Sequence, residues 1–413
     1  MRLPWIALVA ACAHPHPLPP DVPVDLPSDQ VRRYSIWLGG ARVGTATETE
    51  TWSGDGVRLR RDEVMGFLRG DAEINLATTI DIDADPALIA QRVRWTERGA
   101  DVRTAEAHRE RDRWQLSTGG SLTTAAVPAE LVPLLVRRDG AFAGTVFLPA
   151  RGFVLGRGRI DSVAPGRLVA HLALDSGPLV EATIDLDRDG LPARVVDGEG
   201  VIAIRATAQQ ASATFPRVDL IAATAIPIDG HLRRVRRGMD RLVLEGDIAL
   251  PGVPGQTSRL ASRGVEVELG AGLPGDLPEA TSGADRRRDI TAIMTSVRQR
   301  IAPSLGAPLT SARDAAAATS GDCTTFALAY AALATSVGIP TRVVTGLRVD
   351  GDRLVRHRWA VSWTGHSWIA VDAAFGAAPA GGDLIGLAVH DADDAGLVAG
   401  EAALMQVRRA ARK

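Results

Sequence analysis

One cysteine in this chain stands where a nucleophile would be expected. The 413 residues include only two cysteines, Cys12 and Cys323. Cys323 follows a Gly-Asp pair and begins an alanine-rich stretch, which predicts a helix over 323–337 that ends at Gly338. The positive end of a helix stabilises a thiolate, the reactive form of cysteine, and its N–H groups can stabilise an oxyanion. The sequence therefore presents Cys323 as a candidate for thiol catalysis.

A histidine and an aspartate on neighbouring predicted strands could act as the base and its orienting group. His357 opens the run HRWAVSW, and Asp372 closes the run SWIAVD. A turn centred on Thr364-Gly365 would pair them directly, and a turn centred on Gly365-His366 would set them diagonally, two residues apart. Either register places both on one face of the sheet. The residue types and chain order then fit a triad with an activated thiol.

Each of these residues also has a purely structural explanation. Cys323 could be a packed core thiol, His357 a buried histidine with satisfied hydrogen bonds, and Asp372 a turn residue at a strand end. Spacing alone leaves both explanations open. A poised thiolate would react quickly with a thiol probe near neutral pH, whereas a core thiol would react slowly.

The elements around these residues predict a half built from helices and a sheet. The run RRRDITAIMTSVRQRI places apolar residues on one helical face: Ile290, Ile293, Met294, Val297 and Ile301. The helix that begins at Cys323 follows. After it, the runs TRVVTGLRV, RHRWAVSW and SWIAVDAAF predict strands. Helices followed by an antiparallel sheet give an α+β fold over residues 284–413.

The longer N-terminal part is predicted to be β-rich. Over residues 30–225, apolar and polar residues alternate in short runs broken by glycine turns, as in YSIWLGGARVGTATETETWSGDGVRLRRDEV. This pattern predicts an antiparallel sheet with one dry face. It is similar to the curved half-barrel modules of bacterial envelope proteins. Residues 226–283 are predicted to form a β-rich connecting segment, whose Pro- and Gly-rich end at 276–283 marks a domain boundary.

Residues 1–29 are interpreted as an export signal and a tether. One arginine precedes a short apolar run, 6–11, which is too short to span a bilayer. The run Val-Ala-Ala-Cys ending at Cys12 resembles a bacterial lipobox, in which the cysteine becomes lipidated. Cleavage after Ala13 is the alternative and would discard Cys12. We expect an exported protein of the cell envelope or periplasm, attached to the membrane through lipidated Cys12 and a Pro-rich tether.

Charge and motif content exclude several function classes. The formal net charge of −2 argues against a nucleic-acid-binding protein, which needs an excess of basic residues. No His/Cys cluster has zinc spacing, and no Gly-rich phosphate loop is present. The run DLDRDGLPARVV begins like a calcium loop but has Val196 where a bidentate glutamate is needed. We therefore expect no metal and no cofactor.

Three motifs around the cysteine resemble the transglutaminase-like superfamily. The run GDCTTFALAYAALATSVGIPTRVVTGL resembles its Gly-Asp-Cys helix followed by Gly-Ile-Pro-x-Arg-Val-Val-x-Gly. HRWAVSW is similar to its His-x-Trp strand, and SWIAVD to its returning strand that ends in aspartate. The motifs agree in order and spacing from about residue 308 to 375, with looser similarity back to residue 286.

The resemblance implies a papain-like α+β fold with Cys323 as nucleophile, His357 as base and Asp372 as the orienting residue. Two departures bear on substrate choice and leave these three residues intact. Bacterial relatives often carry Glu-His where this chain has Thr325 and Phe326. They commonly read Asp-Pro-Thr-Phe-Gly where this chain reads Asp-Ala-Ala-Phe-Gly from position 372. The wall beside the thiol is thus expected to be more apolar than in those relatives.

The implied reaction is attack on an amide bond of a protein or peptide, through a thioacyl-enzyme. Water as the acceptor gives a peptidase or amidase, and an amine gives a protein-glutamine acyltransferase that crosslinks. Many bacterial members of the superfamily are hydrolases, so a peptidase or amidase of the envelope is expected first. In a third interpretation, the β-rich part binds an envelope component and the C-terminal domain is a non-catalytic scaffold.

Overall fold

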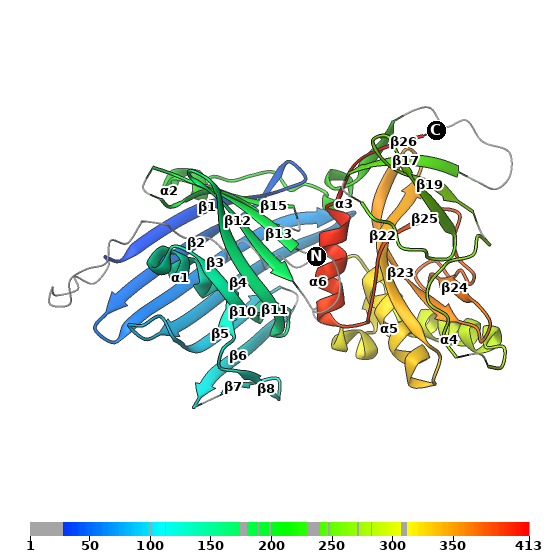
Figure 1. Ribbon diagram of the computed structural model, residues 1–413, viewed down its shortest axis with the longest axis horizontal. Helices are drawn as coiled ribbons and strands as arrows, with labels where there is room; N and C mark the ends of the chain where they lie inside the picture. The colour runs from blue at the N-terminus through cyan, green and yellow to red at the C-terminus, as the bar shows by residue number, and fades with distance from the viewer. Residues whose placement is uncertain are drawn as a thin grey trace. The chain divides into compact units, whose positions relative to one another are not determined.

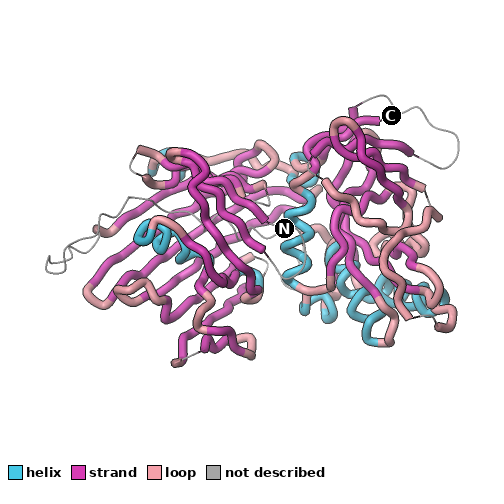
Figure 2. Tube along the Cα trace, viewed as in Figure 1, coloured by secondary structure: helices cyan, strands magenta, loops and turns pink. Residues whose placement is uncertain are grey.

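The computed structural model describes residues 28–412, apart from residues 100, 112, 174–179, 189, 198–199, 230–239, 247, 271, 282 and 307–311. Cys12 and the rest of residues 1–27 therefore lie outside the described residues. Strands make up most of the described chain (Figure 2). The chain divides into two compact units, one within residues 28–223 and the other within residues 224–412 (Figure 1).

The first unit contains one sheet of 15 strands, in the order β8-β7-β6-β5-β4-β3-β2-β1-β15-β14-β13-β12-β11-β10-β9. Consecutive strands pair antiparallel, β1 pairs with β15 to join the two runs, and β9 lies parallel to β10. The strands are β1 (Gln30–Leu38), β2 (Ala41–Ser53), β3 (Gly56–Arg69), β4 (Ala72–Ala84), β5 (Ala90–Arg98), β6 (Val102–Glu110), β7 (Arg113–Leu116), β8 (Ser121–Thr123), β9 (Val127–Pro128), β10 (Phe142–Leu148), β11 (Val154–Ala164), β12 (Arg167–Ala173), β13 (Val180–Leu186), β14 (Pro192–Val196) and β15 (Val201–Arg205). The helical segments are η2 (Ala129–Leu131), α1 (Val132–Asp139), η3 (Pro149–Arg151), α2 (Ala208–Ser212) and α3 (Leu220–Ala223). The antiparallel sheet expected for this part of the chain is present.

Apolar side chains from distant strands meet in one core of this unit. The rings of Trp114 in β7 and Phe147 in β10 lie 5.2 Å apart between centroids, edge to face. Trp114 Nε1 donates to the carbonyl oxygen of Ala126 at 2.9 Å. Val93 in β5 and Leu131 in η2 belong to the same cluster. Because β5 and β10 are far apart in the strand order, the sheet must curve for both to reach this core.

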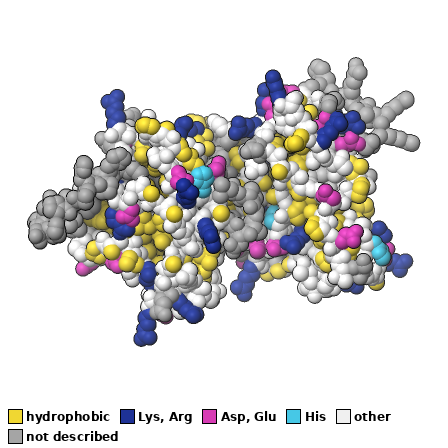
Figure 3. Space-filling view, in the orientation of Figure 1, with side chains coloured by type: hydrophobic (Ala, Val, Ile, Leu, Met, Phe, Trp, Pro, Cys, Tyr) yellow, Lys and Arg dark blue, Asp and Glu magenta, His cyan; other side chains and the backbone are white. Residues whose placement is uncertain are grey.

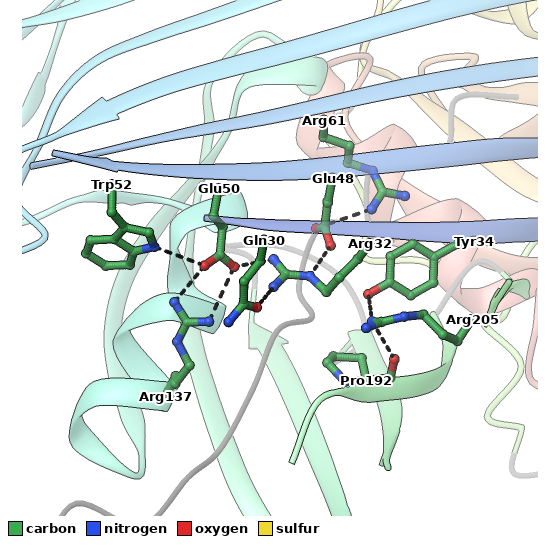
Figure 4. A network of polar contacts seen from close by, with 10 residues as sticks. All are labelled: Gln30, Arg32, Tyr34, Glu48, Glu50, Trp52, Arg61, Arg137, Pro192 and Arg205. Atoms are coloured by element: carbon green, nitrogen blue, oxygen red, sulfur yellow. Dashed lines mark hydrogen bonds and ion pairs between the residues drawn. The ribbon is translucent and has the colours of Figure 1, made fainter. Parts of the chain in front are cut away.

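The buried face of the sheet also carries a ladder of ion pairs across β1, β2 and β3. Arg32, Glu48 and Arg61 oppose one another in register, so the charge alternates from strand to strand. Arg32 Nε donates to Glu48 at 3.3 Å and its Nη2 pairs with Glu50 (Figure 4). Arg61 donates to Glu48 at 3.5 Å and to Glu63 at 3.0 Å. The predicted dry face is therefore not wholly apolar, but its charges are matched by sign.

Helix α1 covers one end of this ladder. Arg137 Nη2 donates to Glu50 Oε2 at 2.7 Å, and its Cζ lies 5.8 Å from a ring centroid of Trp52. Trp52 Nε1 also donates to Glu50, at 3.4 Å (Figure 4). Glu50 is fully buried, so loss of its arginine partners would leave an uncompensated charge inside the unit. Ion pairing thus holds α1 against the sheet.

One buried carboxylate in this region lacks hydrogen-bond partners. The Glu130 side chain in η2 is 3% exposed, and neither of its oxygens has a partner among the described residues. Burial raises the pKa of Glu130 to about 7, against a smaller opposing influence of its own backbone N–H and of Arg61. The folded unit therefore favours the protonated acid.

The second unit contains a nine-stranded sheet in the order β18-β19-β17-β26-β16-β23-β22-β25, with β24 paired to β23. Its strands are β16 (Ile226–Asp229), β17 (Asp240–Gly246), β18 (Gln256–Ala261), β19 (Gly264–Leu269), β22 (Thr341–Asp350), β23 (Arg353–Trp363), β24 (Trp368–Val371), β25 (Leu384–His390) and β26 (Val407–Arg412). The remaining elements are α4 (Arg287–Arg300), η4 (Arg313–Ala317), α5 (Cys323–Ser336), α6 (Asp394–Leu404) and the short pair β20 (Ala302–Pro303) and β21 (Ser320–Gly321).

Residues 226–283, predicted to be a connecting segment, supply four strands to this sheet. Strand β16 pairs with β23 on one side and with β26 on the other. Strand β17 pairs with β26 and with β19. In the structure this segment therefore forms one unit with residues 284–412.

Helices α4 and α5 share a core cluster with β22, β23 and β24. The predicted apolar face of α4 is buried at Ile290, Met294 and Val297. Phe326 and Tyr330 of α5 belong to the same cluster. Helix α5 begins at the predicted residue, and Gly338 follows it with the positive φ of 77° that favours glycine. This packing fixes the N-terminus of α5 close to β23.

The described surface carries mixed charge. On the face shown in Figure 3, basic and acidic side chains are interspersed rather than separated by sign. Within the described ranges, no helix combines the length and the apolar composition needed to cross a bilayer.

The unpartnered carboxylate of Glu130 predicts a pH-dependent stability. Its folded pKa, about 7, lies above the ordinary value of 4.5, so its contribution to stability is fully present below pH 4.5 and is lost as the pH rises through 7. Glu130→Gln should raise the free energy of unfolding of the first unit at pH 8 by up to about 3 kcal/mol and change it little at pH 4.5. Urea denaturation at both pH values measures this. Asp55→Asn, in the exposed β2–β3 turn, is the matched control, and equal effects of the two changes would contradict the prediction.

Candidate active site

The thiol of Cys323 lies at a capped helix N-terminus. Cys323 is the first residue of α5, is partly exposed, and is a free thiol. Asp322 Oδ1 accepts the backbone N–H groups of Thr324 at 3.0 Å and Thr325 at 3.3 Å, which makes Asp322 the N-cap. A Cβ at position 321 would collide with the Thr325 side chain, so glycine is required there. The Gly-Asp-Cys run thus provides the N-cap and the space that allow the helix to begin at the thiol.

The β23–β24 hairpin brings His357 and Asp372 together. Trp363 pairs with Trp368, and the Thr364 N–H donates to the Ser367 carbonyl at 2.9 Å. The turn is therefore centred on Gly365-His366, the second of the two registers that the sequence allowed. Extending this register places Asp372 opposite Trp359, so His357 lies diagonally from it on the same face.

His357 and Asp372 form a buried hydrogen-bonded pair. His357 Nε2 lies 2.8 Å from Asp372 Oδ2, and the two residues are 5% and 3% exposed. The other carboxylate oxygen, Oδ1, accepts the Phe375 N–H at 3.3 Å. With Nε2 engaged by the carboxylate, Nδ1 is the ring nitrogen left for Cys323, whose side chain is near enough to raise the pKa of His357.

The surroundings of His357 favour its charged form. Burial by itself lowers the pKa of His357, but hydrogen bonds to Asp372 and Cys323 and the charges of both outweigh it and raise the pKa to about 10. The imidazole therefore holds a proton at neutral pH, directly beside the sulfur. A protonated ring in this position stabilises the thiolate of Cys323.

Two aromatic rings enclose the imidazole. Trp359, which is buried, stacks on His357 with a centroid distance of 6.0 Å and an interplanar angle of 19°. Phe375 meets the imidazole edge to face at 5.4 Å and is 59% exposed. The ring is thus fixed from the core side by Trp359, while its outer side faces an exposed apolar side chain.

A second polar arrangement, which the sequence analysis missed, lies on the other face of β23. Arg358 donates to Thr345 Oγ1 at 2.9 Å, to Thr324 Oγ1 at 3.0 Å and to Glu401 Oε1 at 2.5 Å. Thr324 directly follows Cys323, so this buried guanidinium ties the N-terminus of α5 to α6. The alternation of β23 gave a signal for it, because an arginine next to His357 must point to the opposite face.

This arrangement ends at a buried neutral histidine. His390 Nδ1 donates to the Asp391 carbonyl at 2.8 Å, and His390 Nε2 lies 2.9 Å from Thr345 Oγ1. Burial lowers the pKa of His390 to about 4, so Nε2 is free to accept the Thr345 hydroxyl. His366, in the hairpin turn, is exposed. Of the three histidines after Cys323, the structure brings His357 to the thiol.

The described residues contain no group of three or more His, Cys, Asp or Glu side chains that could hold a metal ion.

The Arg358–Glu401 pair predicts a large, correctable loss of stability. Arg358→Met should lower the free energy of unfolding of the second unit by about 3 kcal/mol, because it leaves the buried Glu401 carboxylate poorly compensated. Adding Glu401→Leu should restore most of that loss. Arg353→Met, on the same strand as Arg358, breaks the exposed pair with Asp350 at the end of β22 and should change stability by less than about 1 kcal/mol. Denaturant titrations of the four proteins test this, and an unrecovered double variant would contradict it.

Comparison with known proteins adds one finding. The family model described as the transglutaminase-like superfamily matches residues 278–373. This range contains α4, α5, β22, β23 and β24, and it includes Cys323, His357 and Asp372. No curated protein and no solved structure matches the chain. The chain therefore carries a transglutaminase-like superfamily domain over residues 278–373.

Proposed function

We propose that this protein is a cysteine-dependent enzyme that cleaves amide bonds of a protein or peptide through a thioacyl-enzyme. Cys323 is the nucleophile, His357 the acid and base, and Asp372 the residue that orients the imidazole. One observation carries the proposal: the His357 imidazole is held by a buried carboxylate next to a thiol at a capped helix N-terminus. In this proposal, α4 and α5 packed on the sheet form a papain-like α+β domain.

The first step is attack of the Cys323 thiolate on the carbonyl carbon of the amide. A C–S bond forms and the carbonyl oxygen becomes an oxyanion. The N–H groups of Thr324 and Thr325 are engaged by Asp322, and the N–H of Phe326 bonds to the Asp322 carbonyl. The backbone N–H of Cys323 has no acceptor within the described part of the chain. We assign that N–H as an oxyanion donor.

His357 then moves one proton in each half of the reaction. Its Nδ1–H is transferred to the leaving nitrogen as the C–N bond breaks, which releases the amine and leaves a thioacyl-enzyme. The neutral imidazole next takes a proton from the acceptor as that acceptor attacks the thioester. The C–S bond breaks, and the thiolate and the imidazolium are restored. Asp372 stays ionised throughout and stabilises the charged ring.

Water is the proposed acceptor, which makes the protein a peptidase or amidase. This rests on the resemblance to bacterial hydrolases that share the motifs around Cys323. An amine acceptor would give a protein-glutamine acyltransferase, and a non-catalytic scaffold in the envelope is the remaining alternative. We further propose export to the cell envelope and membrane attachment through Cys12, on the strength of the lipobox-like run that ends there.

The proton on His357 predicts an unusual pH dependence of thiol reactivity. Since the pKa of His357 is about 10, alkylation of Cys323 by iodoacetamide should be nearly flat from pH 6 to 8. His357→Ala removes the positive charge that favours the thiolate, so the rate at pH 6 should fall by about 30- to 100-fold. Rates measured by mass spectrometry check this, with Cys323→Ala as the unlabelled control. Equal pH profiles of alkylation for the wild type and His357→Ala would contradict the proposed Cys323–His357 pair.

The reaction product shows whether water or an amine accepts the acyl group. In H₂¹⁸O, dimethylated casein treated with the wild-type protein should gain ¹⁸O at new C-termini or at glutamines converted to glutamate, because water resolves the thioacyl-enzyme. Adding cadaverine should leave this labelling dominant. Cys323→Ala should give no product. Cadaverine adducts on glutamine in place of ¹⁸O would establish acyl transfer, and the absence of any Cys323-dependent product would favour the scaffold.

A further inference from the structure

A hollow on the second unit opens beside the imidazole of His357. Its volume is about 410 Å³, and it lies between α4 and the loop after Asp372. It is lined by Met294, Thr295, Arg298, Gln299, Phe375 and Gly376. None of these six residues is acidic.

Phe375 joins this hollow to the reacting groups. Its ring meets His357 edge to face at 5.4 Å, so the hollow begins one ring away from the imidazole. The Phe375 backbone N–H donates to Asp372 Oδ1 at 3.3 Å, which ties the loop to the same carboxylate that holds His357. An exposed phenylalanine fixed in this way offers an apolar contact to a bound molecule. Any molecule in the hollow would therefore lie close to the scissile bond.

The charge in the hollow comes from Arg298. Its side chain is exposed, and its Nη1 lies 3.4 Å from the carbonyl oxygen of Ala374. No carboxylate of the described residues pairs with it. A Cβ at Gly376 would collide with the Arg298 guanidinium, so the glycine leaves room for this cation against the loop. Gly376 also has a positive φ of 71°, which disfavours any other residue there.

A second guanidinium lies against the Phe375 ring and helps to hold it in place. The Arg348 Cζ lies 3.5 Å from the centroid of the Phe375 ring, and its Nε donates to Asp383 at 2.8 Å. The Arg348 Nη1 is buried and has no hydrogen-bond partner among the described residues. Because Asp383 pairs with Arg348, Arg298 is the guanidinium at the hollow that no carboxylate of the described residues neutralises, and it supplies the positive charge there.

We propose that this hollow binds a carboxylate of the acyl donor, within a residue or two of the amide that Cys323 attacks. The inference rests on the proposed function, because it names the substrate class of the same site. Arg298 pairs with the carboxylate, and Phe375 and Met294 contact the methylene groups that carry it. A guanidinium and a carboxylate form two parallel hydrogen bonds, which gives both affinity and orientation. The carboxylate belongs to an acidic side chain or to a free C-terminus, and the experiment distinguishes the two.

The charge of the hollow can be measured without any substrate. Iodoacetate and iodoacetamide alkylate the same thiol but differ by one negative charge. For Arg298→Gln, the ratio of the iodoacetate rate to the iodoacetamide rate should fall about fivefold, with the iodoacetamide rate unchanged. Arg300→Gln, an exposed residue of the same helix outside the hollow, is the matched control and should leave the ratio unchanged. An equal ratio in wild type and Arg298→Gln would overturn the anion site.

Peptides then test the substrate class. Pairs that differ only by Glu against Gln, or Asp against Asn, beside each amide should be cleaved with a preference for the acid. Arg298→Gln should raise the KM of the acidic member about tenfold with little change in kcat, and Arg298→Lys should recover part of this. A preference that survives C-terminal amidation assigns the side-chain carboxylate, and one that is abolished assigns the free C-terminus. Cleavage with no acidic preference would overturn the inference and leave the proposed function standing. If the alkylation ratio depends on Arg298 as expected but no amide is cleaved, the anion site stands and the result counts against the proposed function.

Discussion

The hydrogen bond between His357 and Asp372 is the interaction on which the site depends. Burial lowers the pKa of His357, and the hydrogen bond to Asp372, together with the neighbouring Cys323, more than compensates for it, so the charged ring is favoured. The same bond settles which ring nitrogen faces Cys323. Through its other oxygen, Asp372 also holds the loop that carries Phe375. One buried carboxylate thus favours the charged form of the imidazole and contacts the loop that carries the nearest exposed side chain.

The two faces of β23, the strand that carries His357, present side chains that make different contacts. One face presents the imidazole, stacked on Trp359. The other presents Arg358, which reaches Thr324 on α5 and Glu401 on α6. Because Cys323 and Thr324 are adjacent, β23 contacts both of the first two residues of α5. A small shift of this helix would therefore disturb a buried ion pair as well as the thiol, which makes the position of the sulfur costly to change.

Local pattern in the sequence was enough to place much of the site and of the fold. The cap at Asp322, the helix start at Cys323 and the alternation of the strand at His357 are short-range features. The hairpin register stayed open between two turns, because Gly365 suits a central turn position in either. In the folded unit a Cβ at Gly365 would collide with the Ala284 carbonyl, so the turn packs against residues distant in sequence, which its own residues do not reveal.

What could not be predicted depends on pairs of residues far apart in the chain. Arg358 and Glu401 are separated by 43 residues; Arg358 occupies the variable position of the His-x-Trp run, and Glu401 stands in none of the motifs. In the first unit, Glu48 and Arg61 looked like the polar side of an alternating pattern. The sheet instead buries them against each other, where matched charge replaces apolar contact. Composition and period cannot distinguish an exposed polar face from a buried, paired one, since both show the same alternation.

The order of strands in the second unit shows that the matched range depends on strands outside it. Strand β26 lies between β16 and β17, and β16 lies against β23, the strand of His357. Strands β16, β17 and β26 all lie outside residues 278–373, the range that the transglutaminase-like superfamily model matches. Glu401, the partner of Arg358, also lies outside this range. The matched range is therefore smaller than the compact unit that contains it. Cut out alone, it would expose a sheet edge and leave the buried Arg358 without Glu401, so residues 278–373 are not expected to fold without the surrounding strands and α6.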